Sequence, residues 1–433
     1  MSEPHARDVA YDDGASASHR YAGPKPTRTV KFWGLPVLLT LVIAAVLSAF
    51  YLTGVLQPMT NLRHFPVAIV NEDAGPTGAQ VVKGMLASFD HDAYDVRVLD
   101  RDQAKNQMDS AQIFGVAVIP PNFSTKLQSY AKSALTPGRV ERAVVIVSTN
   151  PRAGVLGATI ASQALQREVT LIDQRVGQKL SQEVAQQTGE KPAPGAIALM
   201  LANPVEVKTT VHNLLPEGTG NGLSAFYYAL LLVLAGFIGS IVVSRSVDAR
   251  LDEQTPRLRT LLIKWAMIAV TAPLTSVAYV AISAKLGMPV QNPLTLWLFG
   301  TFAILAVGVT STSLITLLGA VGVLVSLFVF VILGLPSAGA TVPLQATPAL
   351  FEWQAKFEPM HQVFIAARSL LYLDGRPGSG LSPALVAIAI DLVIGLLLGA
   401  FVIRGELRRR RPASPAPVEA PSDTFQEAPP QVQ

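Results

Sequence analysis

The chain has 433 residues, of which half are hydrophobic and 15% are charged, and its formal net charge is +4. Soluble domains usually carry about 25% charged residues, so this composition indicates a membrane protein. Cysteine is absent, which excludes disulfides, thiolate metal sites and a cysteine nucleophile. The six histidines are scattered without metal-ligand spacing, and we expect neither a metal nor a cofactor.

Six apolar runs are long enough for helices that cross a bilayer, which need about 20 apolar residues each. They lie at 35–56, 223–244, 261–284, 294–315, 317–336 and 384–403. The stretch from 294 to 336 is too long for one helix, and Gly319 and Gly322 can form a tight turn within it. The first run exceeds the apolar core of a signal peptide, about 7–15 residues, and is interpreted as an anchor. The fold class expected is an α-helical integral membrane protein with six transmembrane helices.

Three segments carry the excess positive charge: the tail 1–34, the segment 245–264 after the second span, and the tail 404–433. Together they hold 15 basic and 11 acidic residues, which accounts for the whole net charge. Because positively charged flanks stay in the cytoplasm, we expect a multi-pass protein of the cell membrane with both termini cytoplasmic. Both tails have few apolar residues, the second being rich in proline, and are expected to be disordered. A nucleic-acid partner is not expected.

Residues 57–222, between the first and second spans, alternate between strand and helix patterns. Strands are expected at 65–70, 94–100, 114–120 and 143–149, and helices at 80–89, 102–112 and 122–133. This alternation predicts an α/β domain outside the cytoplasm. From 157 to 187 the apolar spacing predicts one long helix, interpreted as a stalk between the sheet and the membrane.

The first expected strand ends in Asn71, Glu72, Asp73 and Gly75. Adjacent carboxylates in such a turn can bind a cation, but Asn and Asp more often bond the local backbone as turn and cap residues, the interpretation favoured here. No Ser/His/Asp set, G-x-S-x-G or H-E-x-x-H pattern occurs, so we do not expect an enzyme.

Asp391 lies inside the last span, where a charge costs roughly 2.5–3.5 kcal/mol and must face the bundle or a cavity. It either lines a substrate or proton route or bonds another helix while protonated. Gly395 and Gly399, like Ala235 and Gly239, have the four-residue spacing of small residues that lets helices approach closely. Such pairs pack within one subunit or between two.

Two segments, VAIVNEDAG (67–75) and DRDQAKNQMDSAQIFGVAVIPPNFSTKL (100–127), precede a C-terminal block of spans. This order resembles the phage infection protein-like group of ABC-2 type transporter membrane proteins. A second similarity covers 317–343 and the helix expected at 358–372. The resemblance implies a permease-like membrane domain at 223–403, a homodimer among membrane lipids, and a separate cytoplasmic ATPase.

Export of a lipid, a drug or an envelope component is the function that this resemblance implies, driven by a partner ATPase or an ion gradient. No G-x-x-x-x-G-K-[ST] loop occurs, so the ATPase is expected on another chain. Candidate docking surfaces are the basic region 25–31 and the loop 244–259, through Arg250, Asp252, Glu253 and Arg257; a solvated positive loop is the alternative. The rival function is a non-transporting surface scaffold or receptor, or an accessory subunit of a secretion or envelope assembly.

Overall fold

The protein is described by a computed structural model over residues 30–133, 141–188, 200–252 and 254–409. Residues 1–52 and 53–433 form two compact units. The first unit contains helix α1 (Val30–Thr53), whose segment Gly34–Thr53 has a mean hydropathy of 2.4 and no buried side chains. An apolar helix of this length is stable in such an exposed state when lipid surrounds it.

Within the described residues, five strands form one sheet in the order β2-β1-β3-β4-β5. The strands are β1 (Phe65–Asn71), β2 (Tyr94–Leu99), β3 (Gly115–Ile119), β4 (Ala143–Thr149) and β5 (Val205–Val211). Neighbouring strands are parallel, except that β4 is antiparallel to β3. Residues 65–211, here called the sheet domain, therefore have the α/β order that the sequence predicts. The sequence did not predict β5, an edge strand with mostly exposed side chains.

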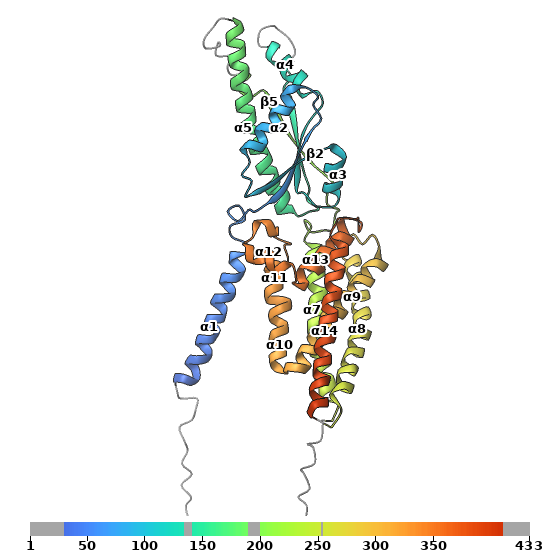
Figure 1. Ribbon diagram of the computed structural model, residues 1–433. Helices are drawn as coiled ribbons and strands as arrows, with labels where there is room; N and C mark the ends of the chain where they lie inside the picture. Colours follow the sequence, from blue (N-terminus) through green and yellow to red (C-terminus); the bar gives the residue numbers. More distant parts are fainter. Residues whose placement is uncertain (1–29, 134–140, 189–199, 253, 410–433) are drawn as a thin grey trace, which may run out of the picture. The chain divides into compact units, whose positions relative to one another are not determined.

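Helices cover both faces of the sheet (Figure 1). One face carries α2 (Pro76–Ser88), α4 (Phe123–Ser133) and α5 (Val155–Thr188), and the other carries α3 (Arg101–Asp109). Alternate residues of β1 serve the two layers: Val67 and Ile69 pack with the first group, whereas Ala68 and Val70 pack with α3. The two-residue period of a strand thus fills two cores at once.

The long helix α5, interpreted from the sequence as a stalk between the sheet and the membrane, packs against the sheet domain. Its buried apolar residues from Ile160 to Val184 belong to the same core as the sheet and α2. The apolar spacing read from the sequence marks this buried face. Helix α5 is therefore a layer of the sheet domain over most of its length.

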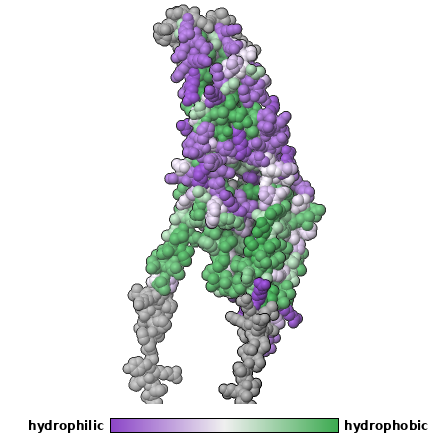
Figure 2. All heavy atoms as spheres, in the orientation of Figure 1, coloured by the Kyte–Doolittle hydropathy of each residue, from purple (hydrophilic) through white to green (hydrophobic). Residues whose placement is uncertain are grey.

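The other five apolar runs form helices long enough to cross a membrane. They are α7 (Ser224–Asp248), α8 (Arg257–Lys285), α9 (Pro293–Leu318), the segment Ala320–Ser337, and α14 (Leu381–Arg409), of which Leu381–Arg404 is apolar. Their bounds differ from the expected ones by up to six residues, mainly because helices continue past their apolar runs. Their surface is apolar, in contrast to the hydrophilic sheet domain (Figure 2).

The fifth span is the least regular. The chain reverses at Gly319, which has a φ of 62°, so the span begins at Ala320 and not at 317. A methyl group at Gly322 would lie 2.2 Å from the carbonyl oxygen of Leu314, so this turn requires glycine twice. The span consists of α10 (Ala320–Leu327), the π-helix η2 (Phe328–Leu333) and α11 (Gly334–Ser337), and it is followed by η3 (Leu344–Ala346), α12 (Ala349–Ala355) and α13 (Pro359–Tyr372).

A buried carboxylate joins the sheet domain to the spans. Asp109, at the end of α3, accepts hydrogen bonds from Lys105, His212, Asn213 and Arg376 at 2.6–2.8 Å, and its side chain is 7% exposed. Burial alone would raise its pKa, but the hydrogen bonds from Lys105, His212 and Asn213 hold that pKa well below its usual range. Because the folded-state pKa is lowered, the stabilisation is complete above the ordinary carboxyl pKa and is lost as the pH falls below it.

Replacement of Asp109 by Asn should lower the free energy of unfolding by about 2–3 kcal/mol, because charge-assisted hydrogen bonds to several donors are lost. Amide hydrogen exchange at 212–213 and near Arg376, together with thermal unfolding in detergent, measures this effect. Asp95→Asn is the matched control, since Asp95 forms a partly exposed pair with Arg97 worth less than about 1 kcal/mol. Equal effects of the two substitutions would show that Asp109 does not hold the domains together.

Candidate functional site

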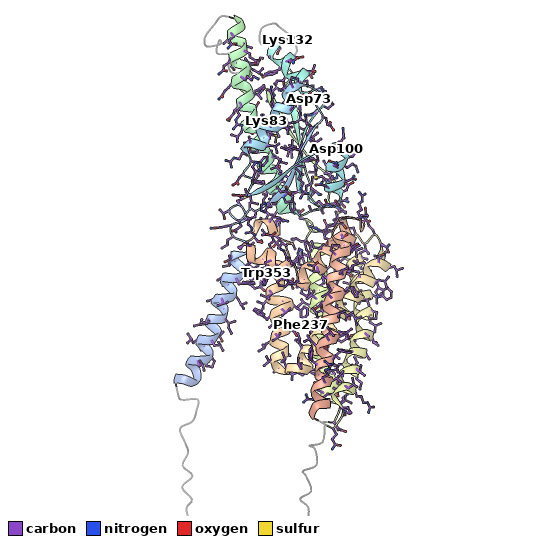
Figure 3. The ribbon with its side chains drawn as sticks, in the orientation of Figure 1. Asp73, Lys83, Asp100, Lys132, Phe237 and Trp353 are labelled. Carbon is purple, nitrogen blue, oxygen red and sulfur yellow. The ribbon has the colours of Figure 1, made fainter. Side chains whose placement is uncertain are left out.

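The end of β1 and the turn before α2 contact the first turns of α2 and α4; Asp73 of this turn is labelled in Figure 3. Asn71 accepts a hydrogen bond from the Asp73 N–H, and the carboxylate of Asp73 accepts from the Gly78 N–H in α2 and from the N–H and hydroxyl of Ser124 in α4. A methyl group at Gly75 would lie 2.4 Å from the hydroxyl oxygen of Ser124, so only glycine fits there. These contacts give the turn a structural function.

Glu72 lies outside this turn network and pairs with Arg101 at 3.0 Å. Within the described residues, no group of three or more His, Cys, Asp or Glu side chains has the geometry of a metal site. The described geometry therefore offers no set of ligands to which Glu72 and Asp73 would belong.

The loop between α7 and α8 presents three of the four residues expected to contact an ATPase. Arg250, Asp252 and Arg257 are exposed, while Glu253 lies outside the described residues, as does most of the region 25–31. Arg250 also donates to the Ser246 carbonyl at 3.0 Å. Lys264 is buried and pairs at 2.8 Å with Asp248, the last residue of α7, so this ion pair anchors the start of the loop.

Asp391 lies at the contact between α14 and α9. The Thr310 hydroxyl donates to the Asp391 carbonyl at 2.9 Å, and the Oδ2 atom of Asp391 is buried without a hydrogen-bond partner among the described residues. A second carboxyl group, that of Glu358, lies close enough to interact electrostatically with Asp391.

Glu358 caps the amino end of α13. Its carboxylate accepts from the Met360 and His361 N–H groups at 2.9 Å each, and the residue is 3% exposed. Burial raises the pKa of Glu358 to about 8, against these two hydrogen bonds, which lower it. A methyl group at Gly334 would lie 2.8 Å from Oε1, so the irregular end of the fifth span makes room for this carboxyl group.

The small residues of the last span pack within the chain. A methyl group would lie 2.4 Å from the Thr310 hydroxyl at Gly395, and 2.3 Å from the Trp265 ring at Gly399. Gly239 differs, because no atom lies within 4 Å of such a methyl group, and Ala235 is only partly buried in the bundle core. Gly395 and Gly399 therefore let α14 pack closely within this helix bundle, whereas the surface of α7 at Gly239 is not covered by other described residues.

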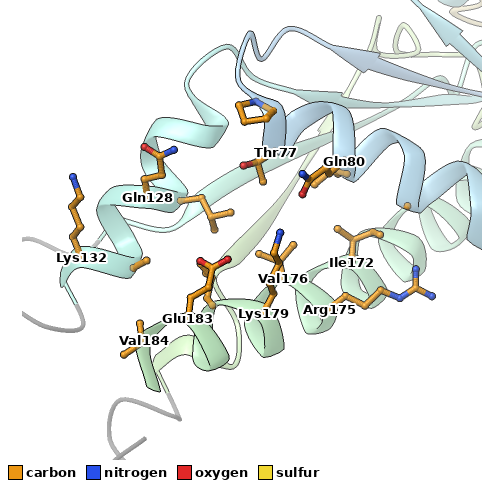
Figure 4. A pocket seen from close by; sticks show the side chains of 16 residues that line it. Thr77, Gln80, Gln128, Lys132, Ile172, Arg175, Val176, Lys179, Glu183 and Val184 are labelled. Carbon is orange, nitrogen blue, oxygen red and sulfur yellow. The ribbon is translucent and has the colours of Figure 1, made fainter. Parts of the chain in front are cut away.

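Three helices of the sheet domain enclose a groove of about 580 Å³ (Figure 4). Its floor is apolar and comes from α2, α4 and α5, through Val81, Leu127, Ile172, Val176 and Leu180. Its rim is polar and mainly basic, through Gln80, Gln128, Lys132, Arg175, Lys179 and Glu183. An apolar floor with a charged rim is suited to an amphiphilic molecule.

Sequence reasoning did not identify Asp109, Glu358 or the groove. A glutamate directly before Pro359 is a recognisable helix-start signal and would have indicated the cap. Asp109 carries no such signal, because three of its partners lie more than 100 residues further along the chain.

Glu358→Gln should make the stability of the protein less dependent on pH. Without the substitution, Glu358 loses its proton above about pH 4.5 in the unfolded state but only above about pH 8 in the folded state. The free energy of unfolding therefore falls as the pH rises through this interval, by a few kcal/mol at most. Thermal unfolding in detergent from about pH 5 to about pH 9 measures the slope. Glu352→Gln, in an exposed pair with Arg63, is the control and should leave the slope unchanged. Equal slopes for native protein and Glu358→Gln would contradict the buried protonated acid.

The chain was compared with known proteins. It matches the family described as ABC-2 family transporter protein over residues 32–401, which is most of its length. Searches among curated proteins and among solved structures gave no match. The match confirms the ABC-2 resemblance, whereas the phage infection protein-like subgroup stays a prediction. The chain therefore belongs to the ABC-2 transporter family and is a multi-pass membrane protein of the permease type.

Proposed function

We propose that the protein is an export permease that moves a lipid, a drug or an envelope component and is driven by a separate cytoplasmic ATPase. The observation that carries this proposal is the family match over 32–401 together with six helices able to cross a membrane. Permeases of this family pair with cytoplasmic ATPases. The sheet domain holds no metal cluster among its described residues, and the proposal assigns it no enzymatic reaction.

In this proposal the sheet domain lies outside the cytoplasm and both termini lie inside. The distribution of lysine and arginine supports this orientation, since the excess is confined to 1–34, 245–264 and 404–433. The cell membrane is the proposed location. The hydrophilic surface of the sheet domain is consistent with its lying in water (Figure 2).

The α7–α8 loop is the proposed docking surface for the ATPase. Arg250 and Asp252 are exposed between α7 and α8, Arg257 is exposed at the start of α8, and the Lys264–Asp248 ion pair holds the end of α7 against α8. Exposed charges of both signs on an anchored loop favour an oriented protein contact. Glu253 belongs to the same proposal on its place in the sequence alone.

Reversal of both charges, Arg250→Glu with Arg257→Glu, should reduce co-purification of the ATPase in mild detergent by about tenfold or more, because complementary charges become repulsive. ATP-dependent export should fall in parallel in reconstituted vesicles. Lys285→Glu, exposed at the opposite end of α8, is the control and should retain the ATPase. Unimpaired co-purification by the double variant would reject this loop as the docking surface.

An ion gradient is the alternative energy source, and Asp391 is its candidate residue. Its Oδ2 atom, which is buried without a hydrogen-bond partner among the described residues and lies within electrostatic range of Glu358, supports a proton-carrying role. The structural alternative is a hydrogen bond to a neighbouring helix.

Asp391→Asn should abolish transport that depends on a pH gradient, because an amide cannot carry the proton. Uptake by inverted vesicles, with ATP or with an imposed pH gradient, separates the two energy sources. Glu358→Gln tested beside it shows which acid is needed. Transport with unchanged pH dependence in Asp391→Asn would reject the proton route and leave ATP as the drive.

A homodimer through α7 is also proposed. Gly239 is open, and Ile238 and Val242 are 51% and 58% exposed on the same helix. A small residue between exposed aliphatic side chains suits close packing of two membrane helices.

The groove of the sheet domain favours a second candidate function, a surface receptor or an accessory subunit of a secretion or envelope assembly. Co-purification separates the two functions. A bound ATPase supports transport, whereas envelope or secretion components without an ATPase support the receptor or scaffold.

A further inference from the structure

A pocket of about 350 Å³ lies where the spans meet the sheet domain. Four parts of the chain enclose it: the start of α5, the start of α7, helix α13 and the segment 340–341. The lining residues used below are Arg152, Gly154, Val155, Leu156, Leu223, Phe364, Arg368 and Tyr372. Its volume is within the range of small-molecule sites, roughly 300–1,000 Å³.

Two arginines line the pocket, and no aspartate or glutamate does. Arg152 donates to the carbonyl oxygens of Leu214 and Tyr372 at 3.1–3.2 Å. Arg368 donates to the carbonyl of Ala153 at 2.8 Å, and its Nε is buried without a hydrogen-bond partner among the described residues. Both guanidinium groups therefore donate to neutral carbonyl oxygens.

This arrangement contrasts with the other arginines of the junction. Arg376 pairs with Asp109 and Arg63 pairs with Glu352, each at 3.3 Å or less. Burial lowers the pKa of Arg368 to about 10, which still leaves its guanidinium charged at neutral pH. An enclosed cation without a counter-ion is costly, and an anion from outside the chain would offset that cost.

The amino end of α5 adds a second source of positive potential. The helix is 34 residues long, and the Ala158 N–H to Gly154 carbonyl bond is its first turn, so the N–H groups of residues 155–157 precede the intrahelical bonds. Gly154, Val155 and Leu156 line the pocket. Helix N-termini bind phosphate and carboxylate groups through such N–H groups and the helix dipole.

The remaining walls are apolar. Leu223, Leu156 and the Phe364 ring lie on the same pocket, and the Arg368 guanidinium stacks 5.6 Å from the centre of that ring. The Tyr372 ring also lines it, with its hydroxyl bonded to Ser224 and to the Ala225 N–H. A small inorganic anion would leave these walls unused.

We propose that this pocket binds the anionic phosphate headgroup of an amphiphile, with the phosphate on Arg152, Arg368 and the amino end of α5 and the first part of the alkyl chain against Leu223 and Phe364. The inference goes beyond the proposed export function, since it states binding and does not require transport. Bound as cargo or as a resident lipid, such a molecule would join the sheet domain to α7 and α13.

The test measures binding to the full chain in a non-ionic detergent, by native mass spectrometry and thermal shift. The probes are dioctanoyl phosphatidylglycerol, dioctanoyl phosphatidylcholine and inorganic phosphate. The anionic lipid should bind about tenfold or more tightly than the zwitterionic one, since choline would bring a cation beside two arginines. Inorganic phosphate should bind far more weakly than the anionic lipid, because it gains nothing from the apolar walls.

Two variants assign the binding to this pocket. Arg368→Gln should lower the affinity for the anionic lipid by about tenfold or more, because a charge-assisted contact is lost. Val155→Glu places a negative charge at the amino end of α5, which favours the folded helix but repels an anion, so it should keep its thermal stability and lose the lipid. Arg97→Gln, in the partly exposed Arg97–Asp95 pair of the sheet domain, is the control and should bind normally.

Equal binding of the two lipids, or lipid binding unchanged in Val155→Glu, would overturn the proposal. Inorganic phosphate bound as tightly as the lipid would also overturn it, because the site would then be one for a free anion. All three measurements are independent of ATPase docking and of export. Failure of the lipid-binding proposal is therefore distinguishable from failure of the proposed transport function.

Discussion

The absence of hydrogen-bonding partners in lipid hydrocarbon is the constraint on which the rest of this structure depends. Regular helices satisfy their own backbone, and five of the six spans are single α-helices. Some of their hydroxyls donate to carbonyl oxygens, as Ser240 does to Phe237 within α7 and as Ser276 of α8 does to Trp297 of α9. The fifth span departs from regularity through the π-helix η2, in which Phe330 is buried and Phe328 is 50% exposed. This departure leads to Gly334, beside the Glu358 cap, so the irregular backbone lies next to a buried polar group.

The same constraint favours ion pairs at the two ends of the helix bundle. One end has the Lys264–Asp248 pair, and the other has the junction around Asp109. Because Asp109 binds His212 and Asn213, directly after β5, and Arg376, in the loop after α13, a displacement of that loop must carry His212 and Asn213 with it or break these contacts. The junction therefore couples the positions of α13 and the sheet far more tightly than a flexible linker would.

Local patterns explain what the sequence predicted and what it did not. Six spans and strands β1 to β4 follow from run length and alternation, which depend on neighbouring residues alone. Strand β5 was not predicted because its sequence, VEVKTTV, is that of an exposed edge strand without an apolar run. The length of α5 was predicted but its burial was not, since helical spacing does not say what covers the apolar face. Asp73 was recognised as a cap candidate, whereas its contact with Ser124, 51 residues away, required the fold.

The packing of α14 limits how subunits can meet. Gly395 lies against Thr310 and Gly399 lies against Trp265, so both close approaches are already occupied within the chain. The position of Asp391 is set by the same contact with α9, and moving α14 to a second subunit would break it. Gly239 has no neighbour, and the aliphatic residues beside it face outward. Of the two small-residue pairs that the sequence offers for a dimer, the one on α7 keeps Gly239 open among the described residues, while Ala235 packs against the bundle core.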